Sequence, residues 1–407
     1  MRQFLSAAVA LAAFAHAIPA LADCANVPAS SVLPQISITP VTVRVMQDAL
    51  YPVSATDGYT HIAYAAEVIN ARPEPVDIDS VTPVDPTKGF APTGKNQPVD
   101  TANQPIAGKV KLFSQPGQYT ARIPGGSAGI MFFDVAYRDS AQVPALLSHR
   151  IVVSDAKTHD RIEGLTNPLQ VRCDLPVVLH PPLKGHGWWD SNGCCQIVNA
   201  HRGATLPTNG DFKAPEQFAI DYVQIDDAGG CCTGPVKDVK SWKFFGAPVL
   251  AAAAGKVVEV SDGMAEQVPG PAVGVTAENA PGNHIIQDIG NGHYVLYAHL
   301  KTGTIPKDIK PGSELTVGQQ IGEVGNTGSS TAPHLHFQVM DRPSALNSVG
   351  LPFVFDTQVL EGKVRQPPSE ADGIYESGKS LTVEKVGPAV MHGTMPAETQ
   401  VFGYNLE

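Results

Sequence analysis

The run Ser330-Thr331-Ala332-Pro333-His334-Leu335-His336-Phe337-Gln338-Val339 holds two histidines separated by one residue in an extended, apolar setting. This pattern predicts a β-strand over residues 334–340. Side chains i and i+2 of a strand share one face and lie about 6.5 Å apart. His334 and His336 therefore face the same way, so one can bind a metal while the other reaches a substrate or water there. Histidine, the commonest metal ligand, titrates near neutral pH and suits both roles.

A second strand is expected upstream, over residues 293–300. In His293-Tyr294-Val295-Leu296-Tyr297-Ala298-His299-Leu300, period-2 alternation places Val295, Tyr297 and His299 on one face. The preceding Asn291-Gly292 is a strong hairpin signal, with a partner strand expected at 284–289. His299 is therefore a third histidine, available from a second strand. Further strands are expected at 217–225 and 247–260.

The N-terminal half is also β-rich. Short alternating strands separated by turn residues are expected at 36–45, 59–70, 118–123, 129–137 and 147–153. This pattern favours an antiparallel, immunoglobulin-like β-sandwich. His61, His149 and His159 are isolated in it, and we interpret them as structural or surface residues.

The domain organisation follows from composition. Proline and glycine recur at short intervals in residues 174–200, which suits an interdomain linker ending at a disulfide-pinned loop, and the chain turns polar and irregular after about residue 362. The fold class is therefore predicted as all-β. We expect a signal peptide at 1–22, a β-sandwich domain at 23–173, the linker and loop at 174–200, a β-rich second domain at 201–362, and a surface-packed C-terminal tail at 363–407.

The first 22 residues resemble a secretory signal, with Arg2 before an apolar core at Phe4–Phe14 and small residues at the expected cleavage site. The apolar run is too short for a transmembrane helix and is interrupted by His16 and Pro19. We therefore expect a periplasmic or secreted protein that begins at Asp23 and has no integral membrane segment after signal removal.

The formal net charge is −11, and it becomes −12 when Arg2 leaves with the signal. Phosphate binding depends on clustered lysine and arginine. An acidic chain without basic patches therefore argues against nucleic acid as a partner.

An even number of cysteines in the exported part favours disulfides over free thiols. We expect Cys24 to pair with Cys173 and the two vicinal pairs, Cys194-Cys195 and Cys231-Cys232, to cross-link to each other. Asp23 directly before Cys24 argues against lipid attachment. The Cys-Cys doublets also lack the Cys-x-x-Cys spacing of structural zinc sites.

Residues 244–340 carry a set of motifs in a particular order. They are Phe245-Gly246-Ala247-Pro248-Val249-Leu250-Ala251-Ala252, Gly255-Lys256-Val257-Val258, Gly282-Asn283-His284-Ile285-Ile286, Tyr297-Ala298-His299-Leu300, Gly318-Gln319-Gln320-Ile321-Gly322-Glu323-Val324-Gly325-Asn326-Thr327-Gly328 and the His334/His336 run. This succession resembles the LytM/lysostaphin-type zinc metallopeptidases, which cleave peptide cross-links of bacterial cell walls. The close match covers about a quarter of the chain. It implies a β-rich, lysostaphin-type fold for the second domain.

The resemblance also implies a ligand set for Zn²⁺, formed by a histidine and an aspartate of an early motif and the second histidine of His-x-His. We assign these to His201, Asp221 and His336. The usual early motif separates its two ligands by three residues, whereas nineteen separate His201 from Asp221. Asp211 and Asp226 are rival candidates. Asp221 is favoured because its carboxylate lies in an otherwise apolar strand, where a metal would offset the cost of burial.

His299 and His334 are the catalytic residues that the resemblance implies, as proton acceptor or oxyanion stabiliser. His284 and His293 fit less well and are interpreted as structural. Gly322, Gly325 and Gly328 suit either tight turns or a wall close to an extended peptide. Asn326, Ser329 and Ser330 are weaker candidates for orienting substrate amides.

The function that the resemblance implies is an exported zinc endopeptidase acting on peptidoglycan stem peptides or cross-links. Two alternatives stay open. One is a catalytically silent wall-binding regulator of other hydrolases, which the stretched early motif leaves room for. The other is a zinc peptidase acting on a non-wall protein or peptide, which the lack of a recognisable wall-binding repeat mildly favours.

Overall fold

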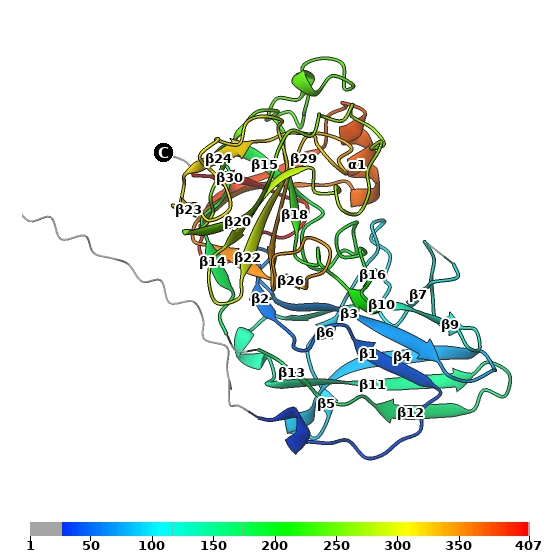
Figure 1. Ribbon diagram of the computed structural model, residues 1–407. Helices are drawn as coiled ribbons and strands as arrows, with labels where there is room; N and C mark the ends of the chain where they lie inside the picture. The colour runs from blue at the N-terminus through cyan, green and yellow to red at the C-terminus, as the bar shows by residue number, and fades with distance from the viewer. Residues whose placement is uncertain (1–26, 116, 173, 406–407) are drawn as a thin grey trace, which may run out of the picture.

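The computed structural model describes residues 27–405 except 116 and 173 (Figure 1). The expected signal peptide, Cys24 and Cys173 lie outside these residues. The described chain is almost entirely β-structure, with thirty strands and one α-helix, α1 (Pro368–Glu376), which confirms the all-β prediction. No described helix is both long enough and apolar enough to cross a membrane.

Two antiparallel sheets form the N-terminal half. They share one core, in which the rings of Tyr64 and Phe133 stack at 4.7 Å. This is the predicted sandwich. One sheet contains β1 (Val41–Val45), β2 (Pro52–Ser54), β3 (Thr60–Asn70), β6 (Lys95–Asn96), β7 (Val110–Leu112), β8 (Tyr119–Thr120) and β10 (Ala128–Tyr137). The other contains β4 (Val76–Asp85), β5 (Ala91–Pro92), β9 (Arg122–Ile123), β11 (Leu146–Asp155), β12 (Arg161–Leu165) and β13 (Leu169–Gln170).

An eleven-stranded sheet forms the second half, in the order β23-β20-β21-β22-β25-β18-β15-β30-β28-β29, with β26 pairing β25. Its strands are β15 (Gly185–Ser191), β18 (Ile220–Gln224), β20 (Gly255–Ser261), β21 (Asn283–Asp288), β22 (Tyr294–Leu300), β23 (Glu314–Leu315), β25 (Leu335–Met340), β26 (Gly350–Leu351), β28 (Gln358–Val364), β29 (Val383–Met391) and β30 (Gln400–Tyr404).

Three short pairs complete the β-structure. They are β14 (Val177–Leu179) with β27 (Phe353–Phe355), β16 (Leu206–Thr208) with β17 (Asp211–Lys213), and β19 (Pro248–Leu250) with β24 (Gln320–Glu323). Single 3-10 turns occur at Ala29–Ser31, Pro86–Lys88, Ser140–Gln142 and Val239–Ser241.

The hairpin signal at Asn291-Gly292 is confirmed. Both residues have positive φ, 54° and 74°, as a tight two-residue hairpin turn requires, and they connect β21 to β22. β22 pairs next with β25, and β25 with β18, all antiparallel. Four of the expected strands, β21, β22, β25 and β18, therefore lie side by side in the sheet.

Residues 174–200 are not a linker, so that prediction is wrong. They contain β14 and β15, and β15 is an interior strand of the large sheet whose Trp188 and Trp189 are buried. Prolines and glycines do crowd this stretch, but burying two indole side chains stabilises a strand more than local composition disfavours it.

The expected surface-packed tail at 363–407 is also wrong. It contains α1, β29 and β30, and β30 is buried between β15 and β28. β15 and β30 lie about two hundred residues apart in the chain, so their pairing cannot be predicted from local sequence. The large sheet therefore includes strands that precede and strands that follow the predicted second domain in the sequence.

The expected cross-link between the two cysteine doublets is wrong as well. Cys194 is bonded to Cys195, and Cys231 and Cys232 are free thiols. The doublets lie on different loops, the first beside Ala397 and the second beside Trp242. Each doublet therefore packs beside a different segment of the chain, a placement that cysteine spacing in the sequence does not reveal.

The sandwich packs directly against the second half of the chain (Figure 1). Val198 lies in a small core cluster with Ala65 and Phe132 of the sandwich. The Gln217 amide donates a hydrogen bond to the Ala63 carbonyl, and the buried Arg202 guanidinium donates to the Phe133 carbonyl at 2.7 Å. Arg202 directly follows His201, so the sandwich contacts the loop that carries a predicted zinc ligand.

Candidate metal centre

The site begins with the pairing of β18 and β25. Asp221 and His336 are directly opposite each other in this antiparallel pair, and the His336 Nδ1 lies 3.0 Å from Asp221 Oδ1. Leu335 and Phe337 point into the core, so His336 points to the other side of the sheet. The pairing of two strands more than a hundred residues apart thus creates the first contact of the site.

His201 reaches Asp221 from the loop after β15. Its Nδ1 faces two carbonyl oxygens, Asn192 O at 2.9 Å and Ala219 O at 3.1 Å, which fix the ring. Its Nε2 lies 3.1 Å from Asp221 Oδ2. A histidine separated from the aspartate by nineteen residues is therefore brought to it by the fold.

These three residues fit a zinc ion. One ligand atom from each of His201, Asp221 and His336 lies within 4.8 Å of the others. Tetrahedral ligands at zinc bond lengths are about 3.3 Å apart, close to the 3.0 Å from His336 Nδ1 to Asp221 Oδ1 and the 3.1 Å from His201 Nε2 to Asp221 Oδ2. Two imidazoles with one carboxylate is also a donor set that catalytic zinc uses.

The two rival aspartates lie elsewhere. Asp211, in β17, forms ion pairs with Arg44 at 2.8 Å and Lys213 at 3.1 Å. Asp226 pairs with Lys243 and accepts hydrogen bonds from the backbone of its own turn. Each carboxylate is already neutralised by lysine or arginine, and neither contacts His201 or His336.

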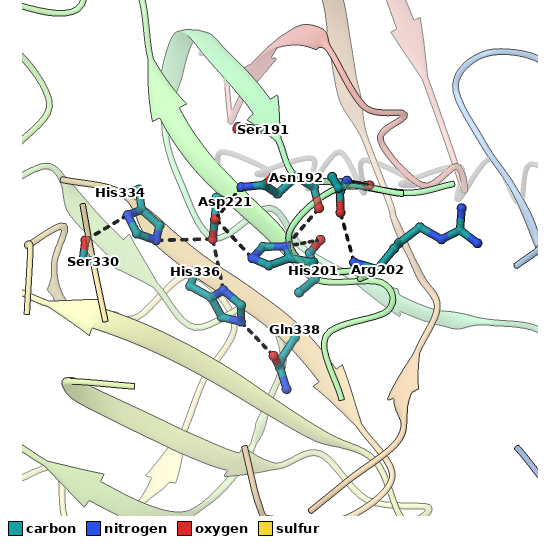
Figure 2. A network of polar contacts seen from close by, with 12 residues as sticks. Ser191, Asn192, His201, Arg202, Asp221, Ser330, His334, His336 and Gln338 are labelled. Atoms are coloured by element: carbon teal, nitrogen blue, oxygen red, sulfur yellow. Dashed lines mark hydrogen bonds and ion pairs between the residues drawn. The ribbon is translucent and has the colours of Figure 1, made fainter. Parts of the chain in front are cut away.

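His334 lies on the same side of the sheet as His336, as the strand pattern predicts. Its Nε2 is 3.3 Å from Asp221 Oδ1, and its Nδ1 faces the Ala332 carbonyl at 2.8 Å and the Ser330 hydroxyl at 3.2 Å. Figure 2 shows the rings of His201, His334 and His336 converging on the Asp221 carboxylate.

His299 lies in the site, but its side chain is on the opposite face of β22 from the one that strand alternation predicts. Val295 and Tyr297 point into the core, whereas His299 lines the same cavity as Leu296 and Ala298. The prediction that His299 shares a face with Val295 and Tyr297 is therefore wrong. His299 has a φ of +61°, and this break in the extended strand turns its side chain to the other face.

The His299 ring is held close to the other histidines. Its Nδ1 faces the Thr327 carbonyl at 2.7 Å, and its ring centroid lies 4.6 Å from that of His334 and 5.8 Å from that of His336. The five predicted site residues thus line one cavity of about 310 Å³. A larger cavity of about 740 Å³, between β15, β28 and β29, contains none of them.

The electrostatics centre on Asp221. Burial disfavours its charge, but His201 and His334 outweigh burial and hold the pKa of the carboxyl well below its usual range. Burial likewise opposes protonation of His201, yet Asp221 and Glu216 raise its pKa to about 9. Burial together with His334 and His336 holds the pKa of His299 well below its usual range. The site therefore concentrates one negative charge among four imidazoles.

Several residues near the site were missed by sequence reasoning. The Asn192 amide donates to Asp221 Oδ2 at 3.1 Å, and Ser191 contacts Asp372 of α1 at 3.5 Å. Burial, Glu376 and Asp221 raise the pKa of Asp372 to about 6. No local sequence pattern identifies Ser191, Asn192 or Asp372 as residues near the site. Gln338 was detectable, because it lies two residues after His336 and so shares its face of β25.

The weaker candidates differ in their positions. Asn326 is buried and binds Gln267 and Ser330, while Ser329 lines the cavity. A Cβ on Gly325 would lie 2.3 Å from the Lys301 nitrogen, so close packing within the chain explains this glycine. His284 is buried and faces the Gly282 carbonyl and Glu259, consistent with its structural interpretation.

Comparison with known proteins identifies part of the chain. Residues 241–348 match the model of Peptidase family M23. The matched segment contains His299, His334 and His336, whereas His201 and Asp221 precede it.

Two curated relatives illustrate the similarity. The peptidoglycan DD-endopeptidase ShyA of Vibrio cholerae is 35% identical over 82 residues, 20% of this chain and 18% of that protein. The glycyl-glycine endopeptidase ALE-1 of Staphylococcus capitis is 31% identical over 140 residues, 34% of each chain. The matches thus span about a third or less of each relative's length.

Among solved structures, the catalytic domain of lysostaphin from Staphylococcus simulans is 24% identical, with a TM-score of 0.21, and the alignment covers 42% of this chain and 86% of that domain. From the match of the family model, residues 241–348 form a domain of Peptidase family M23, the family of LytM and lysostaphin.

Proposed function

We propose that this protein is an exported, zinc-dependent endopeptidase that hydrolyses peptide bonds of peptidoglycan stem peptides or cross-links. The observation that carries the proposal is the convergence of His201, Asp221 and His336 on one point, beside His299 and His334, in a single cavity. Three ligands leave a fourth position of a tetrahedral metal open, as catalytic zinc sites require.

His201 Nε2, Asp221 and His336 Nδ1 would hold the metal. Bound zinc would supply Lewis acidity, lowering the pKa of a water toward about 7 and polarising a carbonyl oxygen. The residues themselves are held in place before any metal binds, because carbonyl oxygens of Asn192 and Ala219 fix the His201 ring. Such outer partners orient metal-binding histidines and tune their affinity.

His299 and His334 act on the reacting groups. Each ring presents its Nδ1 to a backbone carbonyl, of Thr327 and Ala332 respectively, so an Nδ1–H donates there and the Nε2 is left for the cavity. An Nε2 so placed can accept a proton from the attacking water, return it to the leaving amine, or donate to the developing oxyanion. Two such rings with centroids 4.6 Å apart permit these tasks to be divided.

The substrate and location are proposed from the relatives. The similar proteins include a peptidoglycan DD-endopeptidase and a glycyl-glycine endopeptidase. The N-terminal 22 residues have the pattern of a secretory signal, which supports a periplasmic or secreted location. The β-sandwich would serve as a support for the metal site through Arg202 and Gln217.

The test is digestion of purified sacculi by the mature protein, with and without a chelator, followed by mass spectrometry of the released fragments. We expect loss of cross-linked peptides that chelation abolishes and added zinc restores. His336→Ala should be inactive. His293→Ala, a change of a half-buried histidine that follows the hairpin turn and does not line the cavity, is the matched control and should keep full activity. Intact sacculi after treatment with zinc-loaded protein would contradict the proposal.

A further inference from the structure

The four imidazoles of the site are not held in the same way. His201, His299 and His334 each direct Nδ1 to a backbone carbonyl and leave Nε2 for the site. His336 is reversed, because its Nδ1 faces Asp221 at 3.0 Å. Its Nε2 therefore points away from the site and needs a different acceptor.

That acceptor is the side chain of Gln338, two residues further along β25. Gln338 Oε1 lies 2.7 Å from His336 Nε2, and both side chains are buried. An amide oxygen can only accept, so His336 Nε2 must carry the hydrogen. A neutral imidazole then has its lone pair on Nδ1, which is the atom aimed at the proposed metal position. The hydrogen bond thus selects the tautomer that can bind a metal.

The other end of the same amide has no partner. Gln338 is 1% exposed, and its Nε2 makes no hydrogen bond within the described residues. Figure 2 shows this nitrogen on the side of the amide away from His336, and Gln338 lines the cavity together with Leu296 and Leu346. A buried N–H without an acceptor costs roughly 1–3 kcal/mol, which an acceptor brought by a ligand would recover.

We propose that Gln338 is a positioning residue with two roles: its oxygen holds His336 in the metal-binding tautomer, and its N–H₂ group donates to a backbone carbonyl of the bound peptide. This inference rests on the proposed function. Residues i and i+2 of a strand are about 6.5 Å apart, so the carbonyl in question belongs to a residue beside the scissile bond and not to the scissile group itself. The ligand class is an extended peptide whose carbonyl lies over Leu296 and Gln338.

Two substitutions separate the roles. Gln338→Glu keeps an acceptor for His336 Nε2–H but has no N–H to donate, whereas Gln338→Met keeps the volume and removes both. Zinc affinity, measured by competition with a chelating dye, should fall roughly 10- to 100-fold in Gln338→Met and stay within about 3-fold of wild type in Gln338→Glu. The visible spectrum of the cobalt-substituted protein should change only in Gln338→Met. Equal zinc affinity and identical spectra in all three proteins would overturn the first role.

The second role is tested by binding. Calorimetry with purified cross-linked muropeptides and chelated, metal-free protein measures peptide affinity without turnover. We expect both variants to bind roughly 3- to 10-fold more weakly than wild type, the effect of one lost hydrogen bond. Unchanged affinity in Gln338→Glu, or no binding by wild type, would overturn this role. Neither zinc binding nor calorimetry depends on hydrolysis, so failure of the proposed function would appear separately, as intact muropeptides with zinc-loaded wild type.

Gln287→Glu is the matched control. Gln287 is a buried amide in β21 of the same sheet, bonded to Ala253 and Tyr297 and absent from the cavity lining. It should lose stability without a change in zinc affinity or peptide affinity. A loss of either affinity equal to that in the Gln338 variants would overturn the proposal, because the effect would then come from the loss of a buried amide anywhere in the sheet.

Discussion

Replacing Arg202 with methionine should weaken the metal site from the side of the β-sandwich. The Arg202 side chain is buried, follows His201 directly, and donates to two carbonyl oxygens. One is Cys195 O, in the loop that carries His201, and the other is Phe133 O in β10, at 2.7 Å. Arg202 therefore ties the loop of the proposed zinc ligand to the sandwich, and methionine would fill most of its volume without making either bond.

The magnitude follows from these two bonds. A hydrogen bond with a charged partner contributes about 1.5–3 kcal/mol, so the pair contributes about 3–6 kcal/mol before the cost of burying the guanidinium is subtracted. That cost amounts to several kcal/mol, and methionine does not incur it. Subtracting that cost, we expect Arg202→Met to lose about 0–2 kcal/mol of stability. Because His201 keeps its own contacts with Asn192 and Ala219, zinc affinity should fall about 10-fold, as for other outer partners.

Denaturant titration of the metal-free protein, followed by tryptophan fluorescence, would measure the first effect and dye competition the second. Arg150→Met is the matched control, because Arg150 also donates to a carbonyl, Phe90 O at 3.0 Å, but lies partly exposed in β11. It should cost less than about 1 kcal/mol and leave zinc binding unchanged. If Arg202→Met bound zinc as tightly as wild type, the idea that the sandwich supports the metal site would be refuted.

Three further outcomes are expected. His336→Ala should lose both zinc, by elemental analysis, and turnover, whereas His334→Ala should keep zinc and lose turnover; equal metal loss in both would contradict their different roles. Chelation should lower the melting temperature, since a ligand at 100 times its Kd stabilises by about 2.7 kcal/mol, and zinc should restore it; no shift on either addition would argue against a metal site. Burial opposes protonation of His61, but Asp134 and Asp57 raise its pKa to about 10, so its stabilising effect is complete below about pH 6.5 and lost as pH rises toward 10. Denaturation at pH 6 and pH 10 should show this decrease in wild type and a smaller one in His61→Gln.

Much of the fold could be predicted from local sequence. The strands β3, β10, β11, β21, β22 and β25 follow the alternating apolar pattern within a few residues of their expected bounds. Asn291-Gly292 predicted its hairpin because few other residues accept two successive positive φ angles. The His334/His336 pair could be placed on one face because strand periodicity is a local property.

Other features depend on contacts between distant segments. No local pattern shows that β30 inserts between β15 and β28, or that α1 brings Asp372 beside the site. The sequence therefore predicts a linker at 174–200, where β15 lies, and a tail at 363–407, where α1 and β30 lie. The orientation of His299 depends on one backbone angle of +61°, which strand alternation cannot predict.

The sequence by itself therefore determined many of the strands, the shared face of His334 and His336 and the kinds of ligand available, since these follow from side-chain chemistry and from the two-residue repeat of a strand. Only the tertiary structure decided that His201 and Asp221 meet across nineteen residues, that His336 turns its Nδ1 to Asp221 and its Nε2 to Gln338, and that Arg202 joins the loop of His201 to the sandwich. These features arise from strand pairing and domain packing, in which each residue's environment is supplied by parts of the chain far from it in sequence.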